Sequence, residues 1–175
     1  MTREFNFDRI TADDEDLYLN IVGDFRAPDL VIAPDGHPYL YRWHVTPPKM
    51  PANVYFHIQV SDDPERPLHD HPWDNMSVIL SGDGYRELLS LSEGEPFPDT
   101  INTFIRRPGD VIFRRAKQAH RLLLMPGERG YTMTLFSTGP KINDWGFWYP
   151  EGKRPYQDVT VMKDGMSVHI KPGSM

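Results

Sequence analysis

The chain has 175 residues, of which 39% are hydrophobic and 25% charged, and its formal net charge is −6 at pH 7. This length and composition are typical of one globular domain, and the acidic balance excludes a protein-wide basic surface for nucleic acid or an anionic membrane. The absence of cysteine excludes disulfides, thiolate ligands and a cysteine nucleophile, so a metal site must use histidine, carboxylate, amide or backbone oxygen.

The first predicted element is a helix over residues 11–22, TADDEDLYLNIV, which begin polar and acidic and then become apolar. Thr11 or Asp13 is the expected N-cap, because their side-chain oxygens accept hydrogen bonds from the free amides of a first helical turn. Acidic residues in that turn also favour the positive end of the helix dipole. Residues 26–38 follow as a predicted strand between turns.

Residues 54–60, VYFHIQV, alternate between apolar and polar side chains, which predicts a strand with one face in a core. The apolar face comprises Val54, Phe56, Ile58 and Val60. The other face comprises Tyr55, His57 and Gln59, which either line a pocket, with His57 as an acid–base group, or lie half-exposed on the strand.

Further short strands are predicted between glycine- and proline-containing turns, over residues 76–82, 85–91, 101–107, 110–115, 120–125 and 131–137. The tail, residues 138–159, is rich in aromatic residues, proline and glycine and is expected to fold as a flap over the sheet. Residues 168–175 are expected to form a loose final strand. About eight short strands with one early helix indicate a β-sandwich or barrel.

No apolar run is long enough to cross a bilayer, and residues 1–20 lack the basic-then-apolar order of a signal peptide. We therefore expect a cytoplasmic protein, which the absence of cysteine also favours. Neither a membrane nor a nucleic acid is an expected partner.

The stretch HDHPWD, residues 69–74, places two histidines one residue apart. In an extended chain, His69 and His71 point to the same side and Asp70 to the other. Two imidazoles on one side are able to bind one ion, although a histidine-containing polar turn is a common alternative. His120, at the start of a predicted strand, is the third histidine to consider.

These histidines lie in two segments, LHDHPWDNMSVILSG (68–82) and RRPGDVIFRRAKQAHRL (106–122), which together resemble the two conserved motifs of the cupin superfamily. The residues that match the motif positions are His69, His71, Gly82, Pro108, Gly109 and His120. The resemblance covers residues 54–138. More narrowly, HDHPWD with GPKINDWGFWYPEG looks like a group of small, mostly uncharacterised bacterial and phage-related cupins.

The resemblance implies an all-β double-stranded β-helix, or jelly-roll barrel, with a short N-terminal helical or irregular arm packed outside. It implies one cupin domain over residues 1–175. Residues 1–50 would be the arm and first strands, 54–138 the motif-bearing barrel core, and 139–175 an aromatic C-terminal flap. Because cupins commonly dimerise, it also implies a homodimer.

The sequence departs from the cupin pattern at one ligand position, where Asn75 stands in place of a glutamate. Three alternatives are open: a site of three histidines, a site completed by Asp74, or weak ligation by the Asn75 amide oxygen. We favour three histidines, with Asp74 second. Such a site suits a divalent ion, with Fe(II) favoured and Zn(II), Mn(II), Ni(II) and Cu(II) as alternatives.

Other residues are candidates for a substrate pocket around this ion. Trp73 adjoins the histidine pair, and Asn75 is a pocket candidate as well as a possible ligand. Arg121 is the arginine expected to bind a carboxylate or phosphate. The remaining arginines of its cluster are expected to protect strand edges; they are Arg106, Arg107, Arg114 and Arg115. Glu87 is expected at the surface, with partnership to a histidine as the alternative.

The tail aromatics are interpreted equally as pocket walls or as core and dimer contacts; they are Trp145, Phe147, Trp148 and Tyr149. The first function hypothesis is a mononuclear non-haem Fe(II) dioxygenase for a small, anionic organic substrate. The second is a metal-dependent isomerase, epimerase or lyase. The third is a non-catalytic cupin that binds a small ligand or serves in assembly. The sequence identifies no catalytic residue.

Overall fold

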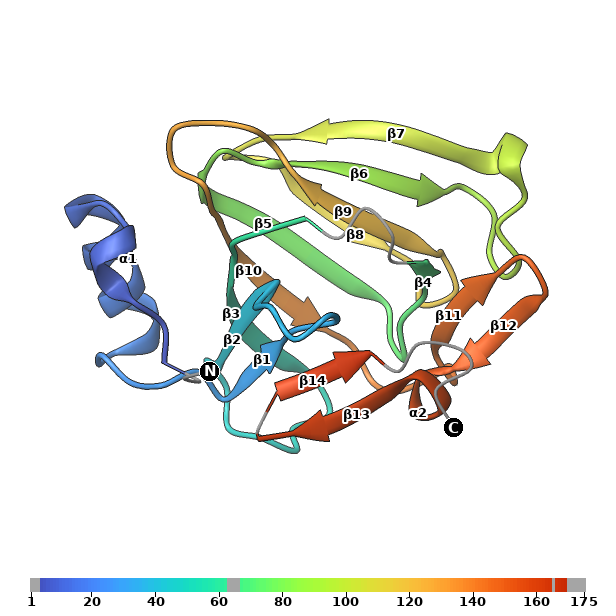
Figure 1. Ribbon diagram of the computed structural model, residues 1–175, viewed down its shortest axis with the longest axis horizontal. Coiled ribbons are helices and arrows are strands. Elements are labelled where there is room, and N and C mark those ends of the chain that lie inside the picture. Colours follow the sequence, from blue (N-terminus) through green and yellow to red (C-terminus); the bar gives the residue numbers. More distant parts are fainter. Residues whose placement is uncertain (1–3, 63–66, 165, 170–175) are drawn as a thin grey trace.

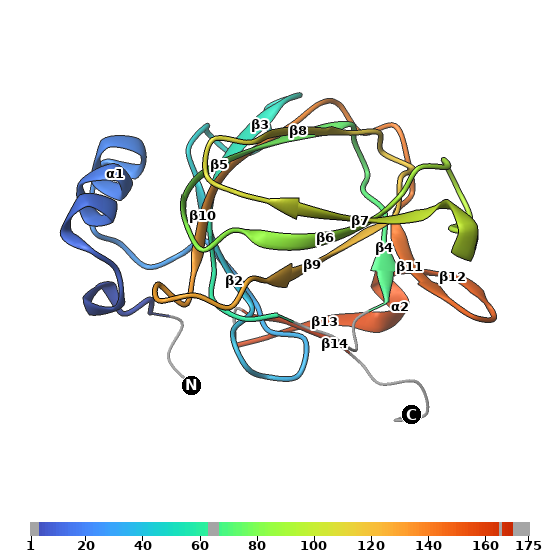
Figure 2. The ribbon, with the colours of Figure 1, turned by 90° about the horizontal axis from the view of Figure 1, so that it is seen from above.

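The computed structural model describes residues 4–62, 67–164 and 166–169. Two β-sheets curve toward each other to form a barrel, and one helix, α1 (Ala12–Val22), lies outside it (Figures 1 and 2). This architecture confirms the predicted all-β jelly roll with a helical N-terminal arm. Among the described residues, no helix is long and apolar enough to cross a lipid bilayer.

The two sheets divide the strands as follows. The first sheet has the order β13 (Thr160–Lys163), β14 (Met166–His169), β1 (Leu30–Ile32), β2 (Leu40–His44), β3 (Asn53–Gln59), β10 (Thr132–Thr138), β5 (Asn75–Gly82) and β8 (Val111–Arg114). The second has the order β12 (Gly152–Pro155), β11 (Gly146–Tyr149), β4 (Leu68–His69), β9 (His120–Leu124), β6 (Tyr85–Ser90) and β7 (Ile101–Arg106). The β1–β14 pair is parallel, and the other pairs are antiparallel.

The predicted helix begins where the sequence indicated. Thr11 is the N-cap of α1, and its hydroxyl oxygen accepts a hydrogen bond from the Asp14 amide at 3.4 Å. Asp13 is therefore not the cap but one of the acidic residues of the first turn. The remaining helices are short: η1 (Phe7–Arg9), η2 (Pro98–Thr100) and α2 (Tyr156–Val159).

The strand predicted over residues 26–38 is shorter than expected. It is limited to β1, because the chain turns at Ala33, whose carbonyl accepts from the Gly36 amide at 3.0 Å. The chain then returns as β2, which the sequence analysis did not identify, and pairs antiparallel with β1. The tail also differs from the predicted flap, because β11 and β12 extend the second sheet and β13 and β14 the first. Residues 170–175 of the predicted final strand lie outside the described residues.

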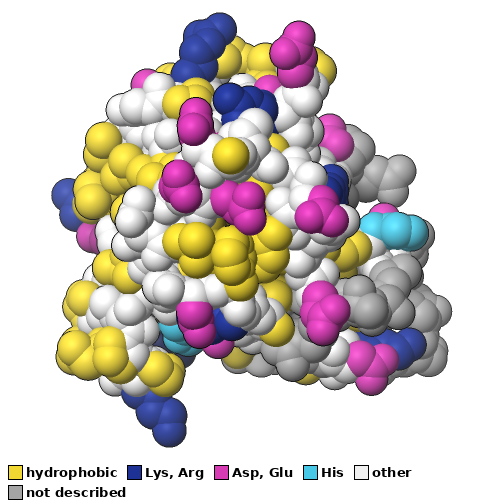
Figure 3. Space-filling view, turned by 90° about the vertical axis from the view of Figure 1, so that its left-hand side faces the viewer, with side chains coloured by type: hydrophobic (Ala, Val, Ile, Leu, Met, Phe, Trp, Pro, Cys, Tyr) yellow, Lys and Arg dark blue, Asp and Glu magenta, His cyan; other side chains and the backbone are white. Residues whose placement is uncertain are grey.

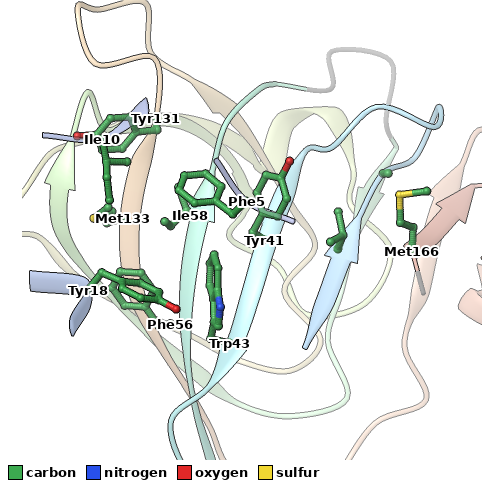
Figure 4. Close-up of a cluster of buried hydrophobic side chains, with 12 residues drawn as sticks. Phe5, Ile10, Tyr18, Tyr41, Trp43, Phe56, Ile58, Tyr131, Met133 and Met166 are labelled. Atoms are coloured by element: carbon green, nitrogen blue, oxygen red, sulfur yellow. The ribbon is translucent and has the colours of Figure 1, made fainter. Parts of the chain in front are cut away.

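Both faces of β3 are buried, for different reasons. Phe56 and Ile58 point out of the barrel into a hydrophobic core between the first sheet and the N-terminal arm, where they pack with Tyr18 of α1 (Figure 4). The predicted apolar face is thus a core face. His57 and Gln59 are also buried but point into the barrel.

Two glycines of the cupin-like motifs occupy backbone conformations that favour glycine. Gly82 has φ +98°, and a Cβ there would lie 2.1 Å from the Tyr131 carbonyl oxygen. Gly109 has φ +97°, and its amide donates to the Ile79 carbonyl at 2.9 Å. Both motifs therefore close tight turns at which a side chain would strain the backbone.

The face that carries α1 shows acidic side chains around exposed hydrophobic ones (Figure 3).

Candidate metal centre

The three predicted histidines come together through the pairing of β4 with β9. His69 on β4 is the direct cross-strand neighbour of His120, the first residue of β9. His71 follows after one residue, and its backbone amide donates to the Ala116 carbonyl at 2.9 Å, which holds it beside the loop before β9. Short strands from distant parts of the sequence thus bring all three imidazoles to one end of the barrel interior.

The geometry of these histidines fits one metal ion. One ring nitrogen from each of His69, His71 and His120 lies within 4.8 Å of the other two, and the Nε2 atoms of His71 and His120 are 2.8 Å apart. Imidazole nitrogens that bind one ion at about 2.0–2.1 Å lie roughly 3–3.5 Å apart. Small side-chain rotations therefore bring the three nitrogens onto one ion.

Glu87 lies behind His120 and is fully buried, so the expectation of a surface position was wrong. Its Oε1 atom is 2.9 Å from Nδ1 of His120. Because a carboxylate only accepts hydrogen bonds, Nδ1 is the donor and Nε2 carries the lone pair that faces the other histidines. A carboxylate that orients a histidine in this way is a common feature of metal centres.

Two arginines form ion pairs with the Glu87 carboxylate. Arg114, which is also buried, donates from Nε to Glu87 Oε1 at 2.5 Å, and Arg106 donates from Nε to Oε2 at 2.8 Å. Burial alone would raise the pKa of Glu87, but the hydrogen bond from His120 and the charge of Arg114 hold that pKa well below its usual range. Arg114 is therefore part of a buried network. The expectation that it protects a strand edge as a solvated side chain was wrong.

Neither Asp74 nor Asn75 joins the histidines. The Asp74 carboxylate accepts from the Ala116 amide at 2.8 Å and pairs with Arg115 at 3.2 Å, which holds it on the loop before β9. Asn75 is buried, and its Oδ1 accepts from Arg114 at 3.4 Å. Both candidate oxygens are thus engaged elsewhere, and the described residues supply a three-histidine group.

The histidines open into a cavity of about 310 Å³ inside the barrel. Three predicted pocket residues, His57, Gln59 and Trp73, line it. Two others do not. The ring of Tyr55 lies under the guanidinium of Arg42. Arg121 follows His120 on β9, so strand alternation turns the Arg121 side chain to the outer face.

The remaining lining is largely apolar and aromatic; it includes Leu30, Ile32, Tyr39, Leu40, Leu122, Phe136, Trp145, Tyr156, Val161 and Met162. Of the tail aromatics, Trp145 lines the cavity and stacks on Tyr156, with ring centroids 4.6 Å apart. Phe147 is buried 5.7 Å from the His69 ring, centroid to centroid. Trp148 and Tyr149 are not among the lining residues.

Arg42 is a cavity residue that the sequence analysis missed. It lies on β2 opposite His57 of β3, and its Nε donates to His57 Nε2 at 2.8 Å. Burial and the neighbouring guanidinium hold the pKa of His57 well below its usual range, so this imidazole is neutral. The alternating stretch YLYRWH (39–44) was the available signal, because it predicts a strand with Arg42 on the face opposite Tyr41 and Trp43.

No family model matches the chain, and no curated protein matches it. Among solved structures, the DMSP lyase DddQ from Ruegeria pomeroyi aligns with a TM-score of 0.51 and 16% identity over 70% of this chain and 58% of that chain. Hydroxypropylphosphonic acid epoxidase from S. wedmorenis aligns with a TM-score of 0.47 and 11% identity over 65% and 57%. The chain thus spans less than two thirds of either protein.

The likeness to DddQ concerns the fold. Together with the sheet topology, it shows that the chain adopts the cupin-type jelly roll implied by its two motifs. The narrower group defined by HDHPWD stays a prediction.

Proposed function

We propose that this protein is a metal-dependent cupin enzyme, and that it is a mononuclear Fe(II) dioxygenase for a small organic anion. The observation that supports this most is the three-histidine group at the wall of a cavity, with the buried Glu87 carboxylate orienting His120. When bound, the ion would supply open coordination positions for substrate and, as iron, redox chemistry toward dioxygen.

The residues of the chain would then bind the substrate and exclude water. Trp73 stacks on His71, with ring centroids 5.5 Å apart, and Phe136 packs against both rings. These apolar groups line the cavity beside the histidines and keep the dielectric low, which strengthens electrostatic contacts made there.

A second candidate is a metal-dependent isomerase, epimerase or lyase. The three imidazoles are neutral donors, so they leave the charge of a divalent ion uncompensated in the immediate ligand set. That charge is suited to polarising a substrate oxygen without any redox step. The third candidate, from another class, is a non-catalytic cupin that binds a small ligand or serves in assembly.

The test begins with metal binding by the full chain. Purified protein freed of metal is titrated with Fe(II) under anaerobic conditions and with Zn(II), Mn(II), Ni(II) and Cu(II). We expect one ion per chain, loss of binding in His120→Ala, and unchanged binding in His37→Ala, which changes an exposed histidine outside the cavity. Glu87→Gln, which keeps the shape but removes the charge behind His120, is expected to weaken binding about 10–100-fold.

Oxygen consumption then separates the reaction classes. The Fe(II)-loaded protein is incubated with a panel of small organic acids while dioxygen is monitored and products are analysed. Dioxygen uptake coupled to product supports a dioxygenase, whereas conversion without uptake supports an isomerase, epimerase or lyase. Absence of metal binding, or full metal affinity in His120→Ala, would overturn the metal-enzyme proposal in favour of the non-catalytic class.

A further inference from the structure

The cavity contains one permanently charged side chain among the described residues that line it, and that side chain is Arg42. The ring of Phe136 lies between His57, which contacts Arg42, and His71 of the histidine group. The Phe136 centroid is 5.2 Å from that of His57, the hydrogen-bond partner of Arg42, and 5.8 Å from that of His71. Arg42 and the histidine group therefore face the same cavity across one aromatic ring.

The contacts of Arg42 hold its guanidinium in place without neutralising its charge. Its Nε donates to the neutral His57, and its Cζ lies 4.7 Å from the centroid of the Tyr55 ring. No carboxylate of the described residues pairs with it. Arg114, the other arginine inside the barrel, contrasts with Arg42 because it is paired with Glu87.

A partly buried guanidinium without a counter-ion among the described residues carries an energetic cost. Taking a charge out of water is unfavourable unless a counter-ion compensates it. Burial lowers the pKa of Arg42 to about 10, which still leaves the side chain charged at neutral pH. The fold thus maintains a fixed positive charge in the cavity, and an anionic ligand would compensate it.

We infer that Arg42 binds the carboxylate of a small organic acid and that the apolar body of this acid lies along Phe136 toward the three histidines. The inference deepens the proposed function, from which it takes only that the cavity is a substrate site. Arg42 thereby becomes the substrate-binding arginine, the role that the sequence analysis had assigned to Arg121.

The chemistry of the site favours a carboxylate with an apolar body. Because Nε of Arg42 is used by His57, the two terminal nitrogens remain for the ligand, and they match the two oxygens of a planar carboxylate. The surrounding walls are largely apolar, with Leu40 on the strand of Arg42 and Phe136 beside His71. A cavity of about 310 Å³ is at the small end of ligand pockets, which indicates a small acid.

The test measures ligand binding by calorimetry with the full chain, both metal-free and Zn(II)-loaded. The probes are acetate, benzoate and 3-phenylpropanoate, each compared with its uncharged amide, and inorganic phosphate. We expect benzoate or 3-phenylpropanoate to bind the wild type at one site per chain, and the matched amide to bind at least about tenfold more weakly. Arg42→Gln is expected to weaken carboxylate binding about 10–100-fold and to leave Zn(II) affinity unchanged.

Two further variants make the result specific. Arg86→Gln removes an exposed arginine on the outer side of β6 and should bind the carboxylates as the wild type does. Arg42→Lys keeps the charge but loses the planar fork, so it should bind the carboxylates more weakly while still preferring them to the amides. This variant decides the question if Arg42→Gln does not fold.

The inference is overturned if no carboxylate of the panel binds, if the amides bind equally well, if Arg42→Gln binds as the wild type does, or if phosphate binds in preference. Metal binding reports separately on the proposed function. Carboxylate binding through Arg42 without metal binding would contradict the metal-enzyme proposal and support the anion site. Metal binding without carboxylate binding would leave the metal-enzyme proposal standing and overturn the anion site at Arg42.

Discussion

Two ionic groups of opposite charge lie inside the barrel: Glu87 is fully buried, and Arg42 is partly buried. Glu87 is compensated by Arg114 and Arg106, and it orients His120. Among the described residues, the side-chain partners of Arg42 are neutral: they are His57 and the ring of Tyr55. The first group is a set of ion pairs that orients His120 so that its Nε2 atom faces the other two histidines. The second leaves a charge that faces the cavity.

The neutral state of His57 predicts a specific dependence of stability on pH. Burial, and secondly the charge of Arg42, depress the native pKa of His57 below its ordinary value of 6.5. Below that value, the unfolded chain takes up a proton that the native protein does not. The free energy of unfolding therefore falls as pH decreases, by up to about 1.4 kcal/mol per pH unit from this group, and the contribution is fully present above the ordinary pKa.

Urea unfolding of the wild type and His57→Gln at pH 7, 6 and 5 tests this expectation. The difference in unfolding free energy between the two should shrink as pH decreases, because the variant lacks the titrating group. His37→Gln, which changes an exposed histidine, serves as the control and should follow the wild type. Parallel pH dependences of wild type and His57→Gln would contradict the prediction.

At the level of elements, β4 is only two residues long, and its position depends on the tail. Asp70, which points away from the histidines as its place between them predicted, is buried. It accepts hydrogen bonds from the Gly146 amide at 2.8 Å and from Lys153 Nζ at 2.6 Å. The Asn143 side chain also donates to the His71 carbonyl at 2.8 Å. The tail thus fixes the strand that carries His69.

Asp70→Asn should therefore loosen the tail from β4. The asparagine still accepts from Gly146 but leaves the charge of Lys153 without its partner, and we expect a loss of stability of about 3 kcal/mol. Hydrogen exchange of the Gly146 amide and of neighbouring β11 amides should become faster. Asp144→Asn, which changes an exposed ion pair with Lys141, should alter stability by less than about 0.5 kcal/mol. Unchanged exchange in Asp70→Asn would show that the tail is held by other contacts.

At the scale of the whole molecule, the first sheet separates two interiors. Its outer face packs against α1 and the N-terminal arm, with Trp43, Phe56 and Ile58 fully buried (Figure 4). Its inner face presents Arg42 and His57 to the cavity. The hydrophobic core that stabilises the wall is thus on the opposite side from the residues proposed to act on substrate.

This division predicts that stability and metal binding respond separately to substitution. Phe56→Ala should lower the free energy of unfolding by about 3–5 kcal/mol through the cavity it leaves in the outer core. Metal affinity, measured at a temperature where the variant is folded by circular dichroism, should match the wild type. Phe136→Ala, on the inner face, provides the comparison, because it removes a ring that contacts His71. Loss of metal affinity in folded Phe56→Ala would contradict the separation.

The predicted homodimer, the cytoplasmic location and the narrower cupin group stay predictions.

Local patterns determined much of the fold and of the histidine group. Alternation predicted β3, the acidic start of 11–22 predicted α1, and the two motifs predicted the meeting of His69, His71 and His120. The first two features depend on neighbours in sequence or on spacing along one strand, whereas the meeting of the histidines joins distant strands and was implied by the resemblance to the cupin motifs. The positions of Gly82 and Gly109 follow from tight turns, which are also local.

Only the tertiary structure decided the rest. Asp74 and Asn75 were open as ligands until Ala116, Arg115 and Arg114 were seen to engage their oxygens. Glu87 was expected at the surface because alternation places a side chain on a face but does not say what that face packs against. For the same reason, the sequence did not indicate that Arg42 faces the cavity and Arg121 does not. Whether a strand residue faces the cavity, the outer core or solvent depends on which strands pair around it, and that pairing joins residues far apart in the chain.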